Sequence, residues 1–352
     1  MQELTDAQPT KRKLAPAVFF TCSAAAIIVC AMLVHTTAFG TPTVTPPAAG
    51  SVSEVPSVTA APDVPVSVPV AVVSPVVGFG AADSGAGVHL SSLAGKRIIS
   101  ISGSEVGTTL LSADGHLYQA TGDGVTDVSS KAPKAVAIAS GAYFTAALSA
   151  SGVTAWGEGY DGNPAAIPTG LTGVTAIAAG DTQILALHSD GTVSTFGGLD
   201  AARIAVPAGL TGVSGIAAGS TNFGAIVGGR VVTWGTDAGA QPTAMAGVQI
   251  VSLVAGDRTF LALSSTGQAY AWGAPWTPNS TLPEAISSRT EIKQIASGRA
   301  HGLVLTKTGQ VLAFGISTLG QATVPTDLAP ATLIGAGSAS SWTVASPATA
   351  TK

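Results

Sequence analysis

Histidines are the side chains that most often act as general bases or metal ligands, and this sequence keeps them apart. The five are His35, His89, His116, His188 and His301. A histidine that acts as a general base needs a nucleophile or an acid as its partner, and no motif in the chain supplies such a partner. We therefore expect His188, which precedes a turn, to face solvent, and His301 to donate a hydrogen bond in packing.

Acidic and cysteine residues also lack the spacing of a reactive site. Asp114 and Asp190 each precede a glycine, which is typical of hairpin turns. The polar loop at residues 158–163 lacks the spaced oxygen ligands of a calcium loop. The cysteines, Cys22 and Cys30, share one apolar run and match no zinc or redox spacing. The sequence thus predicts no catalytic residue, no cofactor and no metal site.

Aromatic side chains are the remaining candidates for binding. Trp156, Trp234 and Trp272 each stand before a glycine at the same place in a recurring pattern. This series could form a platform for sugars, but its alternation with small residues favours packing between repeated units. Trp276 lies outside the pattern, between Pro275 and Pro278, and is predicted to contact a partner.

The chain has 352 residues and a formal charge of -4, with only 10% charged residues. Beyond residue 13 no cluster of Lys and Arg appears, which argues against nucleic acid as a partner because phosphate binding requires one. At 46% hydrophobic residues, the chain has the composition of a folded protein rather than a disordered one.

The N-terminal region predicts a membrane segment. Residues 1–13 end in three basic residues, and Leu14 to Val34 carry no charge, a length that spans a bilayer as a helix. The segment is either a transmembrane anchor or a cleaved secretory signal, because small residues follow it. In both cases the basic flank places the rest of the chain outside the cytoplasm. Residues 35–75 are rich in proline and are predicted to form an extended extracytoplasmic linker.

A repeat of about 39 residues fills residues 98 to 345. Each unit has an apolar strand ending in glycine, a short variable loop, a second apolar strand, a tight turn and a third strand, which in most units ends in Trp-Gly or Phe-Gly. The repeat glycines are Gly103, Gly141, Gly180, Gly219, Gly256, Gly298 and Gly337.

The two ends of the repeat complement each other. The last unit stops after Trp342 without a third strand, while residues 76–80 form an unpaired strand of the Phe-Gly type at the front. Pairing them would close a ring and remove the exposed sheet edges. We therefore predict an all-β fold, a seven-bladed β-propeller over residues 76–345 closed by the N-terminal strand, followed by a short tail at 346–352.

These units resemble the regulator-of-chromosome-condensation repeat family, in particular secreted bacterial seven-bladed members such as the propeller-type β-lactamase inhibitory protein. The resemblance rests on the apolar-Ala-Gly strands, Ala-Leu pairs such as Ala186-Leu187, the Trp-Gly strands and the loop at residues 314–325. It implies that partners bind the loops that follow the repeat glycines. Among those loops, only Tyr143 and Phe144 provide aromatic anchors.

The predicted function is to bind a macromolecule, either an extracytoplasmic protein or a cell-wall component. The expected contact residues are Glu105, Tyr143, Phe144, Asp181, Asp257, Arg258 and Arg299, together with Trp276. Inhibition and adhesion are both open as roles. The alternatives are a surface hydrolase or lyase with its site at the mouth of the channel, and a structural spacer without a specific partner. We expect a monomer that is membrane-anchored, or secreted if the N-terminal segment is cleaved.

Overall fold

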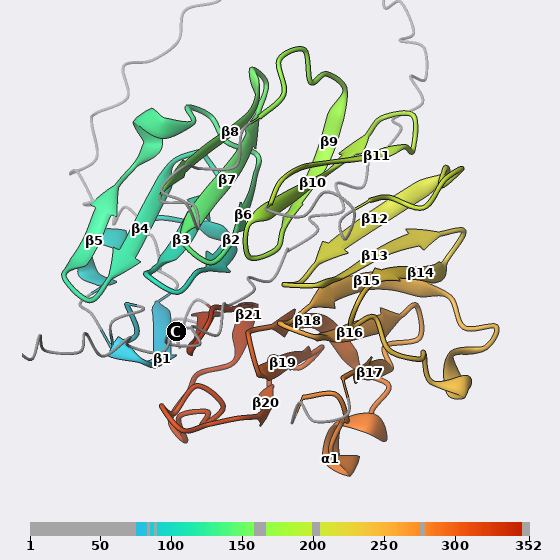
Figure 1. Ribbon diagram of the computed structural model, residues 1–352. Helices are drawn as coiled ribbons and strands as arrows, with labels where there is room; N and C mark the ends of the chain where they lie inside the picture. The colour runs from blue at the N-terminus through green and yellow to red at the C-terminus, as the bar shows by residue number, and fades with distance from the viewer. Residues whose placement is uncertain are drawn as a thin grey trace, which may run out of the picture.

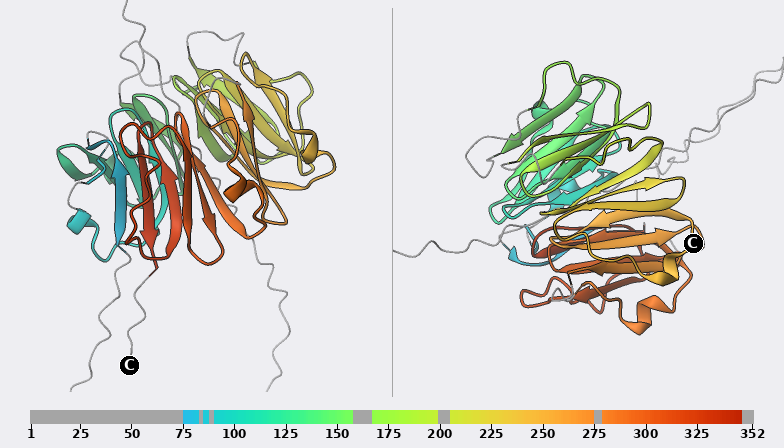
Figure 2. Two further views of the ribbon diagram at one scale, coloured as in Figure 1. Left: turned by 90° about the horizontal axis from the view of Figure 1, so that it is seen from below. Right: turned by 45° about the vertical axis from the view of Figure 1, so that its right-hand side comes forward.

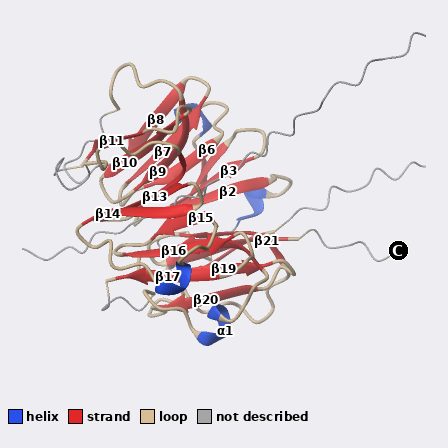
Figure 3. Cartoon of the chain, turned by 90° about the vertical axis from the view of Figure 1, so that its right-hand side faces the viewer, coloured by secondary structure: helices blue, strands red, loops and turns tan. Residues whose placement is uncertain are grey.

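The computed structural model describes residues 75–82, 85–87, 90–157, 167–198, 205–274 and 279–346. Within them the strands form seven antiparallel sheets, six of three strands and one of four, which we number as blades 1 to 7. Helix is confined to short pieces, as Figure 3 shows: η2 (Leu90–Leu93), η3 (Ser129–Lys131), η4 (Thr243–Met245) and α1 (Glu284–Ser287). The predicted all-β class is confirmed.

Each blade follows the strand order of the sequence repeat. Blade 1 contains β2 (Ile98–Gly103), β3 (Thr108–Ser112), β4 (Leu117–Thr121) and an extra edge strand β5 (Gly124–Asp127). Blade 2 contains β6 (Ala137–Ser140), β7 (Phe144–Ser149) and β8 (Gly152–Gly157), and blade 3 contains β9 (Val174–Ala179), β10 (Gln183–His188) and β11 (Val193–Gly197).

The later blades repeat this plan. Blade 4 is β12 (Val213–Ala218), β13 (Asn222–Val227) and β14 (Arg230–Gly235), and blade 5 is β15 (Ile250–Ala255), β16 (Thr259–Ser264) and β17 (Ala269–Gly273). Blade 6 is β18 (Ile292–Ser297), β19 (His301–Thr306) and β20 (Val311–Gly315), and blade 7 is β21 (Ala331–Ala336), β22 (Ser340–Ala345) and β1 (Val76–Gly80).

The blades follow one another around a closed ring (Figures 1 and 2). The first strand of each repeat contacts the first strand of the next, from β2 through to β21, and β21 in turn contacts β2. The second strand is joined to the third by a tight turn whose glycine has positive φ, such as Gly115 at 83° and Gly267 at 86°. Glycine suits these hairpin turns because it has no Cβ to clash.

The closure of the ring confirms the predicted composite blade. Strand β1 pairs antiparallel with β22, from Val76 opposite Val344 to Gly80 opposite Ser340. Opposite Gly78 lies Trp342, which is fully buried. A Cβ at Gly78 would lie 2.9 Å from the indole ring, so glycine is the residue that lets the closing strand pass over it.

The hydrophobic core consists of layers between adjacent blades. Leu185 of blade 3, for example, packs in one cluster with Ile216 and Trp234 of blade 4. Trp234 and Trp272 are 9% and 3% exposed, which confirms their packing role. Trp156 differs, because it is only partly buried.

The predicted N-terminal segments lie outside the described residues, namely residues 1–13, the Leu14 to Val34 segment and nearly all of the 35–75 linker. The polar loop at 158–163, Trp276 and the end of the tail at 347–352 lie outside them as well. Within the described part of the chain, no helix has the length and apolar character needed to span a membrane.

Candidate binding face

The repeat glycines surround the centre of the ring, where adjacent blades come closest. A Cβ at Gly180 would collide with the carbonyl oxygen of Gly219, and one at Gly219 would collide with that of Gly256. The same Cβ positions would collide with the side chain three residues later, such as Gln183 after Gly180. The glycine thus leaves room both for the next blade and for one inward-pointing side chain of its own unit.

Those inward side chains form a buried polar belt that joins the blades. Gln183 Nε2 donates to the Gly219 carbonyl oxygen at 3.0 Å, and Asn222 Nδ2 donates to that of Thr259 at 3.0 Å. His301 Nε2 lies 3.0 Å from Ser341 Oγ. Because each side chain reaches the following blade, the belt fixes the spacing of the strands around the axis.

His301 is fully buried, and burial lowers the pKa of its imidazole from 6.5 to about 4. This confirms that it is a packing residue. His188 departs from the prediction that it faces solvent: it is half-buried, with Nδ1 2.8 Å from the Thr172 carbonyl oxygen and Nε2 2.8 Å from Ser194 Oγ.

Backbone hydrogen bonds link the loops that follow the glycines. The amide of Glu105 donates to the Ala142 carbonyl at 2.9 Å, and the amide of Ala142 donates to that of Asp181 at 2.9 Å. The amide of Asp257 donates to the Arg299 carbonyl at 3.1 Å. The loops therefore meet at one end of the ring, which we call the mouth; its residues are 104–107, 142–143, 181–182, 220–221, 257–258, 299–300 and 338–339.

An ionic contact spans three blades at the mouth. Arg299 Nη1 of blade 6 lies 3.5 Å from Glu105 Oε1 of blade 1, and Ser338 Oγ of the intervening blade 7 donates to Glu105 Oε2 at 3.1 Å. The two charged side chains are 26% and 21% exposed. The sequence prediction that Glu105 and Arg299 belong to one surface agrees with this geometry.

Blades 4 and 5 supply a second polar group at the mouth. Arg258 Nε lies 3.8 Å from Asp237 Oδ2, which also accepts from Thr221 Oγ1 at 2.6 Å. Asp257 accepts a hydrogen bond from Ser220 Oγ. Asp237 was missed by the sequence analysis because it follows a third strand and lies outside the repeat loops.

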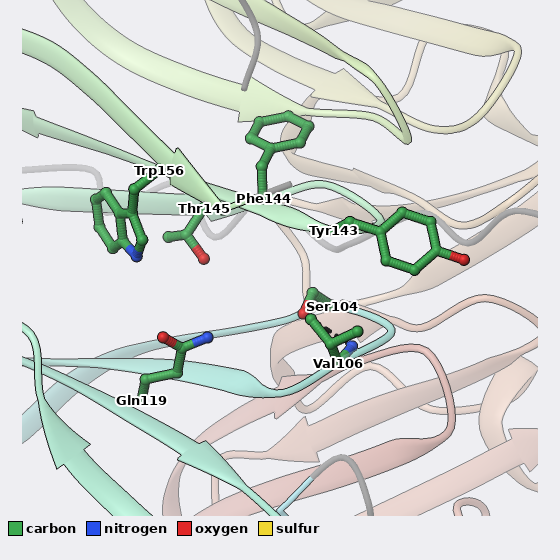
Figure 4. Close-up of a pocket in the computed structure, with 8 residues that line it drawn as sticks. Ser104, Val106, Gln119, Tyr143, Phe144, Thr145 and Trp156 are labelled. Atoms are coloured by element: carbon green, nitrogen blue, oxygen red, sulfur yellow. Dashed lines mark hydrogen bonds between the residues drawn. The ribbon is translucent and has the colours of Figure 1, made fainter. Parts of the chain in front are cut away.

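Two predicted contact residues are buried instead. Phe144 is 2% exposed, and its ring fills the space beside Gly141 that a Cβ would otherwise occupy. Figure 4 shows this ring pointing away from the gap between blades 1 and 2. Asp181 is 5% exposed, so its side chain belongs to the wall of the mouth rather than to its surface. The prediction of surface contacts at these two positions is corrected accordingly.

The surface of the mouth also has apolar groups that the sequence did not single out. Val106 is 49% exposed, next to the half-buried Tyr143 of blade 2. Beside the mouth, Leu319 is 56% exposed on the loop after β20. The carbonyl of Gln321 ties this loop to blade 7 by accepting a hydrogen bond from Ser341 Oγ at 2.6 Å. Exposed valine and leucine carry little sequence signal, because only the fold tells them from core residues.

A pocket of about 340 Å³ opens at the mouth between blades 1 and 2 (Figure 4). Its lining residues are Ser104, Val106, Gln119, Tyr143, Phe144, Thr145, Trp156 and Gly157. No group of three or more His, Cys, Asp or Glu side chains suited to a metal ion occurs among the described residues. The mouth therefore combines paired charges, exposed apolar groups and one cavity.

Comparison with known proteins agrees with this architecture. The family model described as the regulator of chromosome condensation (RCC1) repeat matches residues 292–321. No curated protein sequence matches the chain significantly.

Solved structures share the fold at low identity. Prp20p from Saccharomyces cerevisiae, reported with its binding to Gsp1p and histones, is 18% identical with a TM-score of 0.63, over 79% of this chain and 92% of its own. Yeast RCC1 (Prp20) bound to Kap60 is 18% identical with a TM-score of 0.62, over 79% of this chain and 90% of its own. Human WBSCR16 is 16% identical with a TM-score of 0.56, over 68% of this chain and 85% of its own. With seven sheets closed by the N-terminal strand, the chain has the β-propeller fold of these structures, and its residues 292–321 match the RCC1 repeat.

Proposed function

We propose that the propeller binds another macromolecule, a protein in the first place, through the mouth. The observation that carries the proposal is the set of hydrogen bonds between blades that holds the post-glycine loops together on one face. On that face Glu105 and Arg299 form one ion pair, Arg258 forms another with Asp237, and Val106 and Tyr143 lie beside them. Paired charges around exposed apolar groups suit a protein interface with a polar rim.

The structural neighbours support a role in protein binding. Prp20p is described with Gsp1p and histones, and yeast RCC1 (Prp20) is bound to Kap60. Their fold does not specify the partner of this chain, because propellers carry their binding residues on variable loops. The low charge and the paired arginines at the mouth favour a partner other than nucleic acid.

The proposal includes extracytoplasmic display. The uncharged Leu14 to Val34 segment follows Lys11, Arg12 and Lys13, and the proline-rich residues 35–75 would hold the propeller away from a membrane. In that position the mouth would meet an extracytoplasmic protein or a cell-wall component, as an inhibitor or an adhesion protein. Protease added to intact cells should remove the propeller; its full protection would contradict this placement.

Site-specific photo-crosslinking tests the binding face. A photoreactive amino acid replaces Val106 at the mouth or, as the matched control, Val251, which is 53% exposed at the start of β15 on the opposite end of the ring. We expect a discrete protein adduct from position 106 and none from 251. Arg258→Glu, placed in the Val106 variant, should reduce that adduct.

The purified protein and its Val106 and Arg258 variants are then assayed for binding to secreted β-lactamases, penicillin-binding transpeptidase domains and cell-wall glycans. The activity of the enzymes is followed in parallel. Binding that requires Val106 and Arg258 supports the mouth as the interface. Equal adducts from both ends, or none from the mouth, would overturn it. Tight binding together with loss of enzyme activity would identify an inhibitor.

A further inference from the structure

In blades 2, 4 and 5 the third strand ends in Trp-Gly, and one residue of the second strand faces that tryptophan across the sheet. This residue lies four positions after the repeat glycine. In blade 4 Phe223 stacks on Trp234 with ring centroids 5.9 Å apart, and in blade 5 Phe260 stacks on Trp272 at 5.1 Å. In blade 2 the same position is Thr145, which faces Trp156. Threonine has no ring to cover the indole.

Blade 1 has small and polar side chains in the same place. Thr109 pairs with Gln119 there, and the hydroxyl oxygens of Thr109 and Thr145 form a hydrogen bond of 3.0 Å between the two blades. The pair of threonines leaves the cavity of about 340 Å³ described above, a volume within the range of small-ligand sites. Figure 4 shows Trp156, Thr145 and Tyr143 along one side of it, with Gln119 and Val106 across from them.

Packing holds Trp156 in place beside the cavity. Its indole contacts a buried cluster between blades 1 and 2 that includes Leu117, Ala132 and Ile138. The same side chain contributes to the lining of the cavity. An aromatic ring that packing holds beside a cavity is a rigid stacking surface, so a ligand would gain contact area at little entropic cost.

The polar groups of the cavity are uncharged and include two without a partner. Within the described residues, the Gln119 amide makes no hydrogen bond, and Trp156 Nε1 is buried without an acceptor. The indoles of Trp234 and Trp272 also lack an acceptor, but a stacked phenylalanine fills their surroundings. None of the described residues that line the cavity has a carboxylate, amine, imidazole or guanidinium group. The site therefore suits a neutral ligand that has an apolar face and hydrogen-bonding groups at its edge.

We propose that the cavity between blades 1 and 2 binds one neutral sugar unit of a glycan. The C–H face of the sugar ring stacks on Trp156, and two of its hydroxyl groups exchange hydrogen bonds with the Gln119 amide. The cavity shares Val106 and Tyr143 with the proposed protein-binding face, so glycan binding is measured on the chain without a protein partner.

Titration calorimetry of the full chain tests the proposal with cellotetraose, maltotetraose and tetra-N-acetylchitotetraose. Tetragalacturonate and an uncharged tetrapeptide with one tyrosine serve as comparison ligands. Saturable binding of at least one neutral glycan, with weaker or absent binding of both comparison ligands, is the expected result. Tighter binding of the peptide or of the charged glycan than of the neutral glycans would overturn the proposal. Absence of binding for all five ligands would overturn it as well.

The chain itself provides the variants that locate the site. Thr145→Phe restores the stack of blades 4 and 5 and should abolish glycan binding while preserving the fold. Gln119→Leu removes the amide and should weaken binding by about 5- to 100-fold, the value of two ordinary hydrogen bonds. Trp156→Phe places here the residue that occupies this position in blades 3 and 6, so it should fold and bind more weakly.

Two controls keep the result interpretable. Trp234→Phe changes a tryptophan at the same position of the repeat that lies in blade 4, so it should leave glycan affinity unchanged. Urea unfolding verifies that every variant is folded. Full glycan binding by a folded Thr145→Phe protein would place the ligand elsewhere and refute the assignment.

Discussion

His301 should make the stability of the propeller depend on pH between about 4 and 6.5. In the folded state its pKa is about 4 because the imidazole is buried, whereas the unfolded chain titrates near 6.5. As pH falls through this window, the unfolded state binds a proton that the folded state does not, so the free energy of unfolding decreases. At 1.36 kcal/mol per pH unit the full loss is about 3 kcal/mol, of which about 2.5 kcal/mol develops between pH 7 and pH 4.5.

The structure supplies the matched variants for this test. Gln183 and Asn222 occupy the position of His301 in blades 3 and 4, where their amides also donate to the next blade. His301→Gln and His301→Asn should therefore fold and lose most of the dependence on pH in this window. The lowered pKa of Asp114, about 2, and of Asp190 contributes stability that is lost only below about pH 4, so these carboxyl groups fall outside it.

The assay is urea unfolding followed by tryptophan fluorescence at pH 4.5, 5.5 and 7. Titration of the imidazole by NMR gives the folded-state pKa directly. An unchanged slope in both variants, or a His301 that titrates near 6.5 in the folded protein, would refute the reasoning from burial.

Three further predictions concern closure and the mouth, each checked by urea unfolding. Gly78→Ala places a Cβ against the Trp342 ring and should cost about 1–3 kcal/mol; unaltered stability would show that the closing strand yields. Phe79→Ala empties a buried site between blades 6 and 7 and should cost about 3–5 kcal/mol, with a small loss arguing that β1 contributes little to closure. Arg258→Ala breaks a 3.8 Å surface ion pair and should change stability by less than about 1 kcal/mol; a larger loss would assign it a structural role.

Much of the fold could be predicted because the same local constraint applies to each unit of the repeat. The glycine at the end of each first strand is required because a Cβ there would meet a neighbouring blade or a side chain of its own blade, and this requirement produces a visible period in the sequence. The unpaired strand at residues 76–80 was equally informative, because an open sheet edge needs a partner.

The candidate site was predicted less well. The sequence placed Phe144 among the contact residues, since an aromatic residue after the repeat glycine resembles an anchor. In the structure its ring fills the space beside Gly141. Phe144 is the first residue of β7, and whether a side chain where a loop enters a strand points inward or outward depends on φ and ψ at each residue, which residue type alone leaves open.

The sequence by itself determined the all-β class, the seven units and the closing strand, because those features follow from periodic local constraints. Only the tertiary structure decided that Glu105 meets Arg299 across three blades, and that Thr145 and Trp156 border a cavity between blades 1 and 2. These contacts join residues of different blades. Their distances depend on how far the ring turns from one blade to the next, and that rotation is set by packing of the whole ring and not by any single repeat.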